Sequence, residues 1–223
     1  MIEMILNLDF TPFVLSFKLA LVTTIILFII SLPYAWYLSQ TKSKYKPILE
    51  SITALPIVLP PSVLGFYILI ALSSANSLGI DLAFSFKGLV IASCLYSLPF
   101  MVQPLQNGFE MLDKNILEAS YIAGKSKFTT IKKIAIPNIK SSILTAIIIT
   151  FAHTVGEFGV VLMVGGNIPH ETKVVSVAIY ELVESMDYSM AHIYSGIMVL
   201  LSFFILLLVY IFNRKTSIKL KSF

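Results

Sequence analysis

The chain has 223 residues, of which 57% are hydrophobic and only 13% are charged, and its formal net charge is +4. A soluble globular domain averages about 45–50% apolar and roughly 25% charged residues, so this composition excludes an ordinary soluble protein and indicates a polytopic membrane protein. The single cysteine, Cys94, excludes an intrachain disulfide, and the basic residues alternate with apolar runs in a way that does not indicate nucleic-acid binding.

Apolar runs that approach or exceed the roughly 20 residues of a membrane-crossing helix follow one another along the chain. They cover residues 13–38, 48–72, 88–105, 139–164 and 192–212. Basic residues cluster between or after these runs: Lys42, Lys44 and Lys46; Lys114, Lys125, Lys127, Lys132, Lys133 and Lys140; and Arg214, Lys215, Lys219 and Lys221. The connections 73–87 and 165–191 are nearly free of bases, and the N-terminal residues before Lys18 include Glu3 and Asp9. The positive-inside rule therefore predicts about five spans in the cell (inner) membrane, with the N-terminus outside and the C-terminus in the cytoplasm.

The second apolar run is interrupted by prolines. Pro56, Pro60 and Pro61 precede Ser62 and Gly65, and each proline removes a backbone donor and clashes with the preceding turn. Such breaks are tolerated in lipid only where protein or a water-filled cavity satisfies the freed carbonyls. Pro60, Pro61 and Ser62 are therefore candidate pathway residues, and a simple packing kink is the alternative.

The longest connection with a predicted cytoplasmic location covers about residues 106–138 and is expected to hold two short helices. Asp113 is placed to cap the first, Gly124 to end it in a left-handed turn, and Ser126 to cap the second. Pro137 either stops the second helix or opens the next span. A match of residues 119–126, ASYIAGKS, to a phosphate-binding loop is attributed to chance, because no strand precedes it.

Residues 118–137, EASYIAGKSKFTTIKKIAIP, resemble the EAA signature of ABC importer permeases. The matching positions are Glu118, Ala119, Gly124, Ile134 and Pro137, while Ser120 and Ile136 depart from the pattern. A compact helix–turn–helix can seat in a groove on a partner, with Phe128 and Ile131 as candidate anchors. The alternative is an amphipathic loop that its lysines hold on anionic lipid.

Residues 153–169, HTVGEFGVVLMVGGNIP, place ionisable groups and glycines within an apolar run. A spacing of four residues predicts that His153 and Glu157 share one helix face, and an ionisable group within a span is a candidate functional residue. Because Glu157 and an oxyanion are both negative, we expect the carboxylate to bond His153, backbone donors or a partner subunit. Packing is the alternative role for His153.

The glycines of the same segment are assigned different roles. Gly156 and Gly159 are expected to allow close helix packing, whereas Gly165 and Gly166 are candidate hinge residues at the outer end of the span. These two belong to an outer gate or re-entrant segment, about 165–190, whose helix over about 170–184 carries an apolar stripe and is expected to lie on or dip into the membrane.

Few cations line any span, so the pathway is expected to offer hydroxyls and backbone donors. Ser62, Thr150 and Thr154 are the candidates. Their weak binding suits transport, because a tight site would trap the ion.

The segments 153–181 and 55–69 (LPIVLPPSVLGFYIL) resemble the gate region and second core span of molybdate ABC transporter permeases, and the wider resemblance extends from about residue 15 to 212. It implies one all-α transmembrane permease domain over residues 1–223, of the type I ABC importer kind. It also implies a homodimer, an extracytoplasmic molybdate-binding protein, and cytoplasmic ATPase subunits that bind ATP and magnesium. The chain itself is expected to be non-catalytic and to hold no cofactor or metal.

Other functions compete with molybdate import. Sulfate, thiosulfate and tungstate are alternative substrates, and an ATP-independent channel or secondary transporter is an alternative class. An intramembrane hydrolase that holds a metal through His153 and Glu157 is disfavoured, because the span offers no third ligand at helical spacing.

Overall fold

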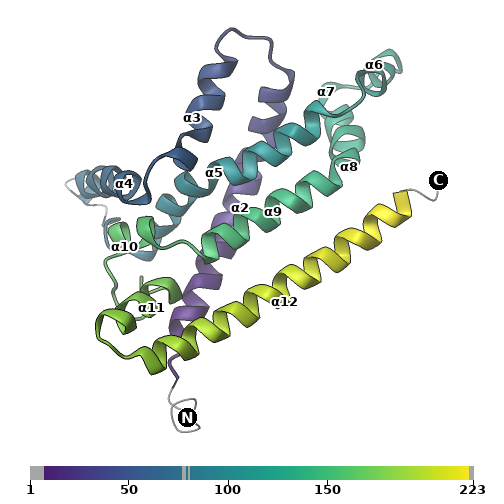
Figure 1. The fold of residues 1–223 in the computed structure, drawn as a ribbon. Helices are drawn as coiled ribbons and strands as arrows, with labels where there is room; N and C mark the ends of the chain where they lie inside the picture. Colours follow the sequence, from purple (N-terminus) through teal and green to yellow (C-terminus); the bar gives the residue numbers. More distant parts are fainter. Residues whose placement is uncertain (1–7, 77–78, 80, 221–223) are drawn as a thin grey trace.

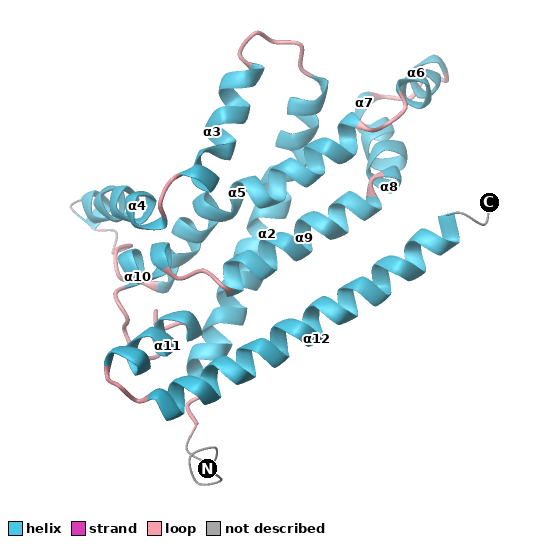
Figure 2. Cartoon of the chain, in the orientation of Figure 1, coloured by secondary structure: helices cyan, strands magenta, loops and turns pink. Residues whose placement is uncertain are grey.

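The computed structural model describes residues 8–76, 79 and 81–220, and within these ranges every regular element is a helix (Figure 2). Three helical segments have the length and hydropathy to cross a membrane: α2 (Thr11–Gln40), α5 (Phe86–Glu110) and residues Tyr188–Leu207 of α12 (Tyr188–Leu220). Two bent helix pairs bring the number to as many as five. The predicted all-α fold with about five spans is therefore confirmed, although Glu3 and Lys221, which the charge argument used, lie outside the described residues.

The centre of the molecule is a bundle of α2, α5 and α9 (Lys140–Val155) (Figure 1). Trp36 of α2 packs edge-on against Phe109 of α5, with ring centroids 5.1 Å apart. α5 and α9 approach closely at Gly108, where a Cβ would lie 2.6 Å from the Cβ of Ser142. A missing side chain thus lets two backbones meet, and the bundle provides the frame on which the shorter helices are mounted.

The second apolar run is not one straight span, and the prolines explain why. α3 (Lys46–Val58) and α4 (Pro61–Asn76) meet at an angle of 110°. Leu59, which precedes Pro60, has an extended backbone with ψ of 135°, as expected for a residue before proline. Pro61 then opens α4, so that α4 projects sideways from the bundle (Figure 1).

The fourth apolar run, 139–164, is also divided. α9 ends at Val155 and α10 (Gly159–Gly165) begins four residues later, after a segment with non-helical backbone at Phe158. A further bend of 74° separates α9 from the preceding residues 127–138, which contain α7 (Lys127–Thr130), the π-helix η1 (Ile131–Ala135) and α8 (Ile136–Asn138). Apolar periodicity shows which residues avoid water, but it does not show where the backbone leaves the helix.

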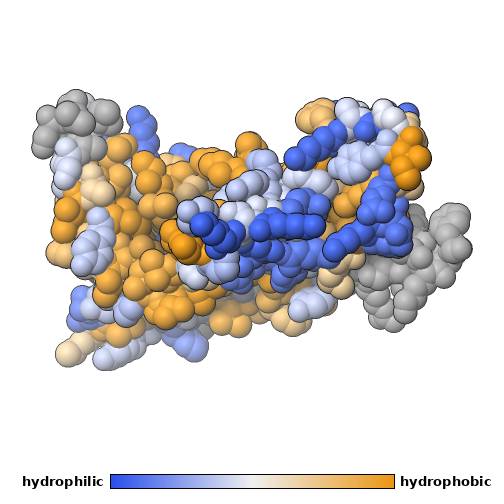
Figure 3. Space-filling model, turned by 90° about the horizontal axis from the view of Figure 1, so that it is seen from above, coloured by the Kyte–Doolittle hydropathy of each residue, from blue (hydrophilic) through white to orange (hydrophobic). Residues whose placement is uncertain are grey.

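The local structure expected for the 106–138 connection is confirmed, although α5 continues to Glu110. Asp113 caps α6 (Lys114–Ile122) by accepting a hydrogen bond from the Asn115 amide at 2.9 Å. Gly124 is left-handed with φ of 73°. Ser126 caps α7 by accepting from the Thr129 amide at 3.3 Å. Seen from above, hydrophilic residues gather across this end of the molecule between hydrophobic flanks (Figure 3).

The outer helix, α11 (Val175–Glu184), begins later than predicted and packs on protein. Val175 and Ala178 of its apolar stripe are buried in a cluster with Phe13 of α2 and Tyr194 of α12. These two residues of the stripe therefore face α2 and α12, and the position of the helix on or in the membrane stays a prediction.

Candidate functional site

The three residues between α9 and α10, Gly156–Phe158, form the centre of the candidate site. His153 lies in the last turn of α9, whereas Glu157 lies beyond its end. The prediction that the two side chains share one helix face is therefore wrong, because the helix stops at Val155 and Gly156 caps it.

His153 is positioned by α5. Its Nδ1 atom lies 2.9 Å from the Ser97 hydroxyl, which is 3.0 Å from that of Thr154. The imidazole stacks on Phe100 with centroids 3.9 Å apart, and Tyr96 lies beside it at 4.8 Å. The hydrogen-bond partner of His153 is thus a serine of α5, and two aromatic rings hold the imidazole plane.

Glu157 is buried, with 4% of its surface exposed. Neither carboxyl oxygen meets the geometry of a hydrogen bond with the described residues, although the Ser93 hydroxyl is close enough to act on the group. Its backbone is well held, since the Ser176 hydroxyl of α11 donates to its carbonyl oxygen at 2.7 Å. The chain therefore fixes the position of Glu157 but leaves its carboxyl unpaired, which is costly for a buried polar group.

An open hollow of about 560 Å³ lies beside this break. Its lining includes the predicted residues Pro61, Ser62, His153, Gly156, Glu157 and Gly159, together with Tyr96, Ala152 and Phe158. Of the other predicted pathway residues, Pro60 lies in the bend next to Pro61, and Thr154 is buried behind His153. The structure thus gathers residues from two separate sequence motifs around one space.

The glycines of the break differ in their surroundings. A Cβ at Gly159 would lie 2.7 Å from the Cβ of Pro61, and one at Gly65 would lie 2.8 Å from that of Met163. α10 therefore packs directly on α4. A Cβ added at Gly156 would have the Ala152 carbonyl oxygen of α9 as its nearest neighbour, at 3.6 Å. The close packing against another helix that was predicted for Gly156 is therefore absent.

Gly165 and Gly166 end α10 in a compact turn at the opposite end of this helix. Gly166 is left-handed with φ of 66°, and a Cβ there would meet the Phe84 ring at 2.8 Å. The buried Thr172 hydroxyl donates to the Gly165 carbonyl oxygen at 2.7 Å. These glycines are therefore required by backbone geometry and packing, and a hinge at this turn stays a prediction.

A salt bridge and a hydrogen bond also hold this turn against α11. Lys173 forms a salt bridge with Glu181, and the Asn167 side-chain amide donates to the same carboxylate at 3.1 Å. The hydrogen bond from Lys173 lowers the pKa of Glu181 below its ordinary value. This contact is partly exposed, so screening by water limits its strength.

A second candidate surface is the projecting knob formed by α6 and α7. Glu118, Ala119, Gly124, Phe128 and Pro137 are exposed, and Ile131 is partly buried. The exposed fraction of Phe128 is 73%, so its ring is free to enter a partner's surface. Sequence reasoning missed Met111 and Ile122, which are 86% and 88% exposed. The available signal was an apolar residue directly after the end of α5 and another at the last position of the short helix α6.

Comparison with known proteins places these features in a family. Residues 20–218 match the model of the binding-protein-dependent transport system inner membrane component. The chain is 44% identical to the molybdenum transport system permease protein ModB of Azotobacter vinelandii, over 92% of this chain and 95% of that protein. It is 33% identical to a putative molybdenum transport system permease protein of Bacillus subtilis, over 93% and 94% of the two chains. It is also 32% identical to a probable sulfate transport system permease protein of Zygnema circumcarinatum, over 91% and 73%.

Solved structures support the same fold at low sequence identity. A structure of the inward-facing MetNI methionine ABC transporter aligns with a TM-score of 0.73 and 15% identity, and it covers 92% of this chain and 94% of its own. The family match spans most of the chain and includes both the broken helix and the projecting knob. The protein therefore belongs to the family of binding-protein-dependent transport system inner membrane components, which are multi-pass membrane permeases.

Proposed function

We propose that this chain is the permease subunit of an ATP-driven ABC importer for molybdate, in which two copies enclose the pathway. The observation that carries the substrate assignment is the 44% identity to a molybdenum permease over nearly the whole of both chains. The whole chain acts as one transmembrane domain, with the N-terminus outside and the lysine-rich end of the bundle in the cytoplasm.

The knob of α6 and α7 is the proposed contact for a cytoplasmic ATPase subunit, which binds ATP and magnesium. It projects from the bundle, and Phe128 and Ile122 present apolar surface for docking. Movement of the knob reaches the core through η1 and α8, which join it to α9. This chain contributes no hydrolytic step and converts the motion into alternating access.

The hollow beside the break is the proposed outer part of the pathway. Its Ser62 hydroxyl and His153 imidazole are uncharged or weakly basic groups that bind an oxyanion weakly. Glu157 also lines this hollow, but its carboxyl oxygens are buried within the chain near the Ser93 hydroxyl, so we assign it a structural role at the break and no direct contact with the anion. An extracytoplasmic binding protein supplies the tight selective site.

Reconstitution tests this proposal. The permease, its ATPase and its binding protein are placed in liposomes, and uptake of labelled molybdate is measured with and without ATP. We expect uptake that requires all three components and that excess tungstate reduces more strongly than excess sulfate does. Uptake without the ATPase would instead show a channel or secondary transporter.

Sulfate is the second candidate substrate, because a sulfate permease is 32% identical over most of this chain. The same liposomes distinguish the two, with labelled sulfate in place of molybdate. Preferential sulfate uptake would overturn the molybdate assignment and leave the importer mechanism standing.

A further inference from the structure

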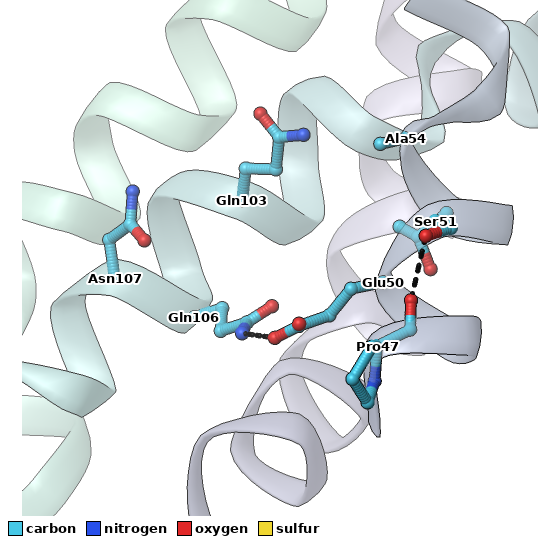
Figure 4. Close-up of a pocket in the computed structure, with 8 residues that line it drawn as sticks. Pro47, Glu50, Ser51, Ala54, Gln103, Gln106 and Asn107 are labelled. Atoms are coloured by element: carbon cyan, nitrogen blue, oxygen red, sulfur yellow. Dashed lines mark hydrogen bonds between the residues drawn. The ribbon is translucent and has the colours of Figure 1, made fainter. Parts of the chain in front are cut away.

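One face of α5 connects the hollow at the break with a second hollow nearer the cytoplasmic end. Tyr96, Phe100, Gln103 and Asn107 are separated by four, three and four residues and therefore lie on one side of the helix. Tyr96 lines the first hollow, and Phe100 stacks on His153. Gln103 and Asn107 line the second hollow, which has a volume of about 520 Å³ and lies between α3 and α5 (Figure 4).

Both side chains are exposed in the single chain, and Gln103 lies well inside the helix α5, which is long and apolar enough to cross a membrane. Gln103 lies seven residues before Glu110, the last residue of α5, which places it about 10 Å along the helix from that end. An amide at this depth has no hydrogen-bond partner in hydrocarbon and is costly there. The face that carries Gln103 and Asn107 is therefore directed toward water or another protein chain.

The exposed surface of α12 supplies the contrast. Among the described side chains after its second turn, the exposed large ones are Val199, Leu200, Phe203, Phe204, Leu206, Leu207 and Tyr210. All but one of these are wholly apolar, and only 11% of the membrane window of α12 is buried in the chain. The α12 surface thus suits lipid, whereas the Gln103 face of α5 does not.

Within the second hollow, most polar groups already have partners. The Gln106 amide donates to Glu50 Oε1 at 2.5 Å and to Glu110 Oε1 at 3.0 Å, and Lys46 Nζ also donates to Glu110 at 2.8 Å. The Ser51 hydroxyl donates to the Pro47 carbonyl oxygen at 2.8 Å.

The side-chain amides of Gln103 and Asn107 remain available. They have no hydrogen-bond partner among the described residues, and Figure 4 shows both directed away from the Glu50–Gln106 pair. Each amide can donate two hydrogen bonds.

We infer that this hollow is a transit site for a tetrahedral oxyanion, which receives hydrogen bonds from the side-chain amides of Gln103 and Asn107. The inference rests on the proposed import function and adds the residues that the anion meets after it passes the break. Neutral amides hold an oxyanion without the strong attraction of a cation, which suits a site that must release its ion. Glu50, Glu110 and Lys46 together leave one net negative charge at the cytoplasmic edge, and this charge favours departure of the anion.

Accessibility to an anionic reagent tests the location. Cys94 is replaced by alanine, and Gln103→Cys and Asn107→Cys are introduced singly into the complete transporter. Treatment with sulfonatoethyl methanethiosulfonate should modify the introduced thiol in both variants, and millimolar molybdate should slow the reaction. Phe203→Cys on α12 is the matched control, exposed in the chain but in a lipid-facing position, and should react at least about tenfold more slowly. Equal rates in all three variants, or no reaction in the Gln103→Cys and Asn107→Cys variants, would overturn the inference.

Transport by a double variant tests the role of the amides. Gln103→Leu with Asn107→Leu should lower molybdate uptake by about tenfold or more, since two hydrogen bonds to the anion are lost. Stimulation of the ATPase by the binding protein should persist. Ser74→Ala on α4, which removes an exposed hydroxyl bonded to the Ile70 carbonyl oxygen and lies outside both hollows, should leave uptake unchanged.

The two proposals fail in different ways. Normal uptake by the double variant beside active unmodified transporter refutes the transit site alone. If the unmodified transporter imports neither molybdate nor sulfate, the import function itself is refuted, and the transit site falls with it.

Discussion

Ser120 occupies the position where the EAA signature has its second alanine, and the structure shows a use for the added hydroxyl. The Ser120 and Thr130 hydroxyls are 2.8 Å apart and buried, so they join α6 to the residue that ends α7. In the sequence, Ser120 stands only as a departure from the signature. At the residue scale it is a specific contact that fixes the shape of the knob.

Ser120→Ala is expected to weaken the docking of the ATPase several-fold. The change leaves the Thr130 hydroxyl buried without a partner, which costs about 1–3 kcal/mol. The affinity of the purified permease for its ATPase measures the effect. Thr129→Ala, which removes an exposed hydrogen bond to Ser126, is the control and should change little. Adding Thr130→Val to Ser120→Ala removes both polar partners and should recover most of the affinity; no recovery would contradict this explanation.

The glycines near the break differ in whether they contact a neighbouring helix. α10 lies on α4 through Gly159 and Gly65, whereas Gly156 only ends α9. α11 secures the same break, because Ser176 binds the Glu157 carbonyl oxygen and Tyr180 packs against Phe158 with ring centroids 5.0 Å apart. At the scale of elements, the region of the Gly156–Phe158 break is thus held by α4 on one side and α11 on the other.

Two glycine variants distinguish packing from simple helix termination. Gly159→Ala places a methyl group 2.7 Å from the Pro61 Cβ, so the thermal midpoint of the purified permease should fall by several degrees. Gly156→Ala meets no atom closer than 3.6 Å and should leave the midpoint nearly unchanged. Equal loss in the two variants would show that backbone freedom, rather than the α4–α10 contact, is the requirement.

The salt bridge between Lys173 and Glu181 should make the turn after α10 sensitive to acid. The pKa of Glu181 is lowered in the folded protein, so its contribution to stability is present above the ordinary value of 4.5 and is lost as pH falls through the lower folded value. Glu181→Gln should therefore be slightly less stable than the unmodified protein at pH 7, by less than about 1 kcal/mol for an exposed pair. Thermal unfolding from pH 7 down to pH 3 should show the difference disappearing; a difference that grows on acidification would contradict the ion-pair account.

The whole molecule has surfaces of distinct kinds, and they imply an orientation. The knob and the basic residues of the loops lie at one end of the molecule (Figure 1). The turn that follows α10 lies at the other end, together with α11. α12 presents apolar side chains outward, and the shared face of α5 presents amides. Under the proposed function, we assign these surfaces to the ATPase, the binding protein, lipid and the pathway between the two copies, respectively.

Labelling from each side of the membrane tests that orientation. In the Cys94→Ala background, Ser126→Cys in the knob should react with a membrane-impermeant reagent only in inside-out vesicles. His170→Cys, exposed after α10, should react only in right-side-out vesicles. Both positions are exposed in the structure, so access should depend on the side alone. Reaction of the Ser126→Cys variant from outside would reverse the topology and remove the cytoplasmic docking role of the knob.

Helix caps and tight turns could be predicted from the sequence, because each depends on one residue and its immediate neighbours. Asp113, Gly124 and Ser126 formed the caps and the turn expected of them. By contrast, the prediction that His153 and Glu157 share a helix face failed, because periodicity alone does not locate the helix end at Val155. Gln103 and Asn107 were also missed, since nothing in the sequence brings α3 beside that face of α5.

The sequence by itself determined that the chain is a helical membrane protein, where its apolar and basic segments alternate, and which short motif forms the knob. Composition, span length and capping are properties of neighbouring residues, so they can be read without knowing the fold. Only the tertiary structure decided that the proline bend and the Gly156–Phe158 break surround one hollow, that the Glu157 carboxyl is buried without a hydrogen bond among the described residues, and that two amides line a second hollow. These features depend on contacts between residues far apart in the chain, and such contacts arise only when the helices pack.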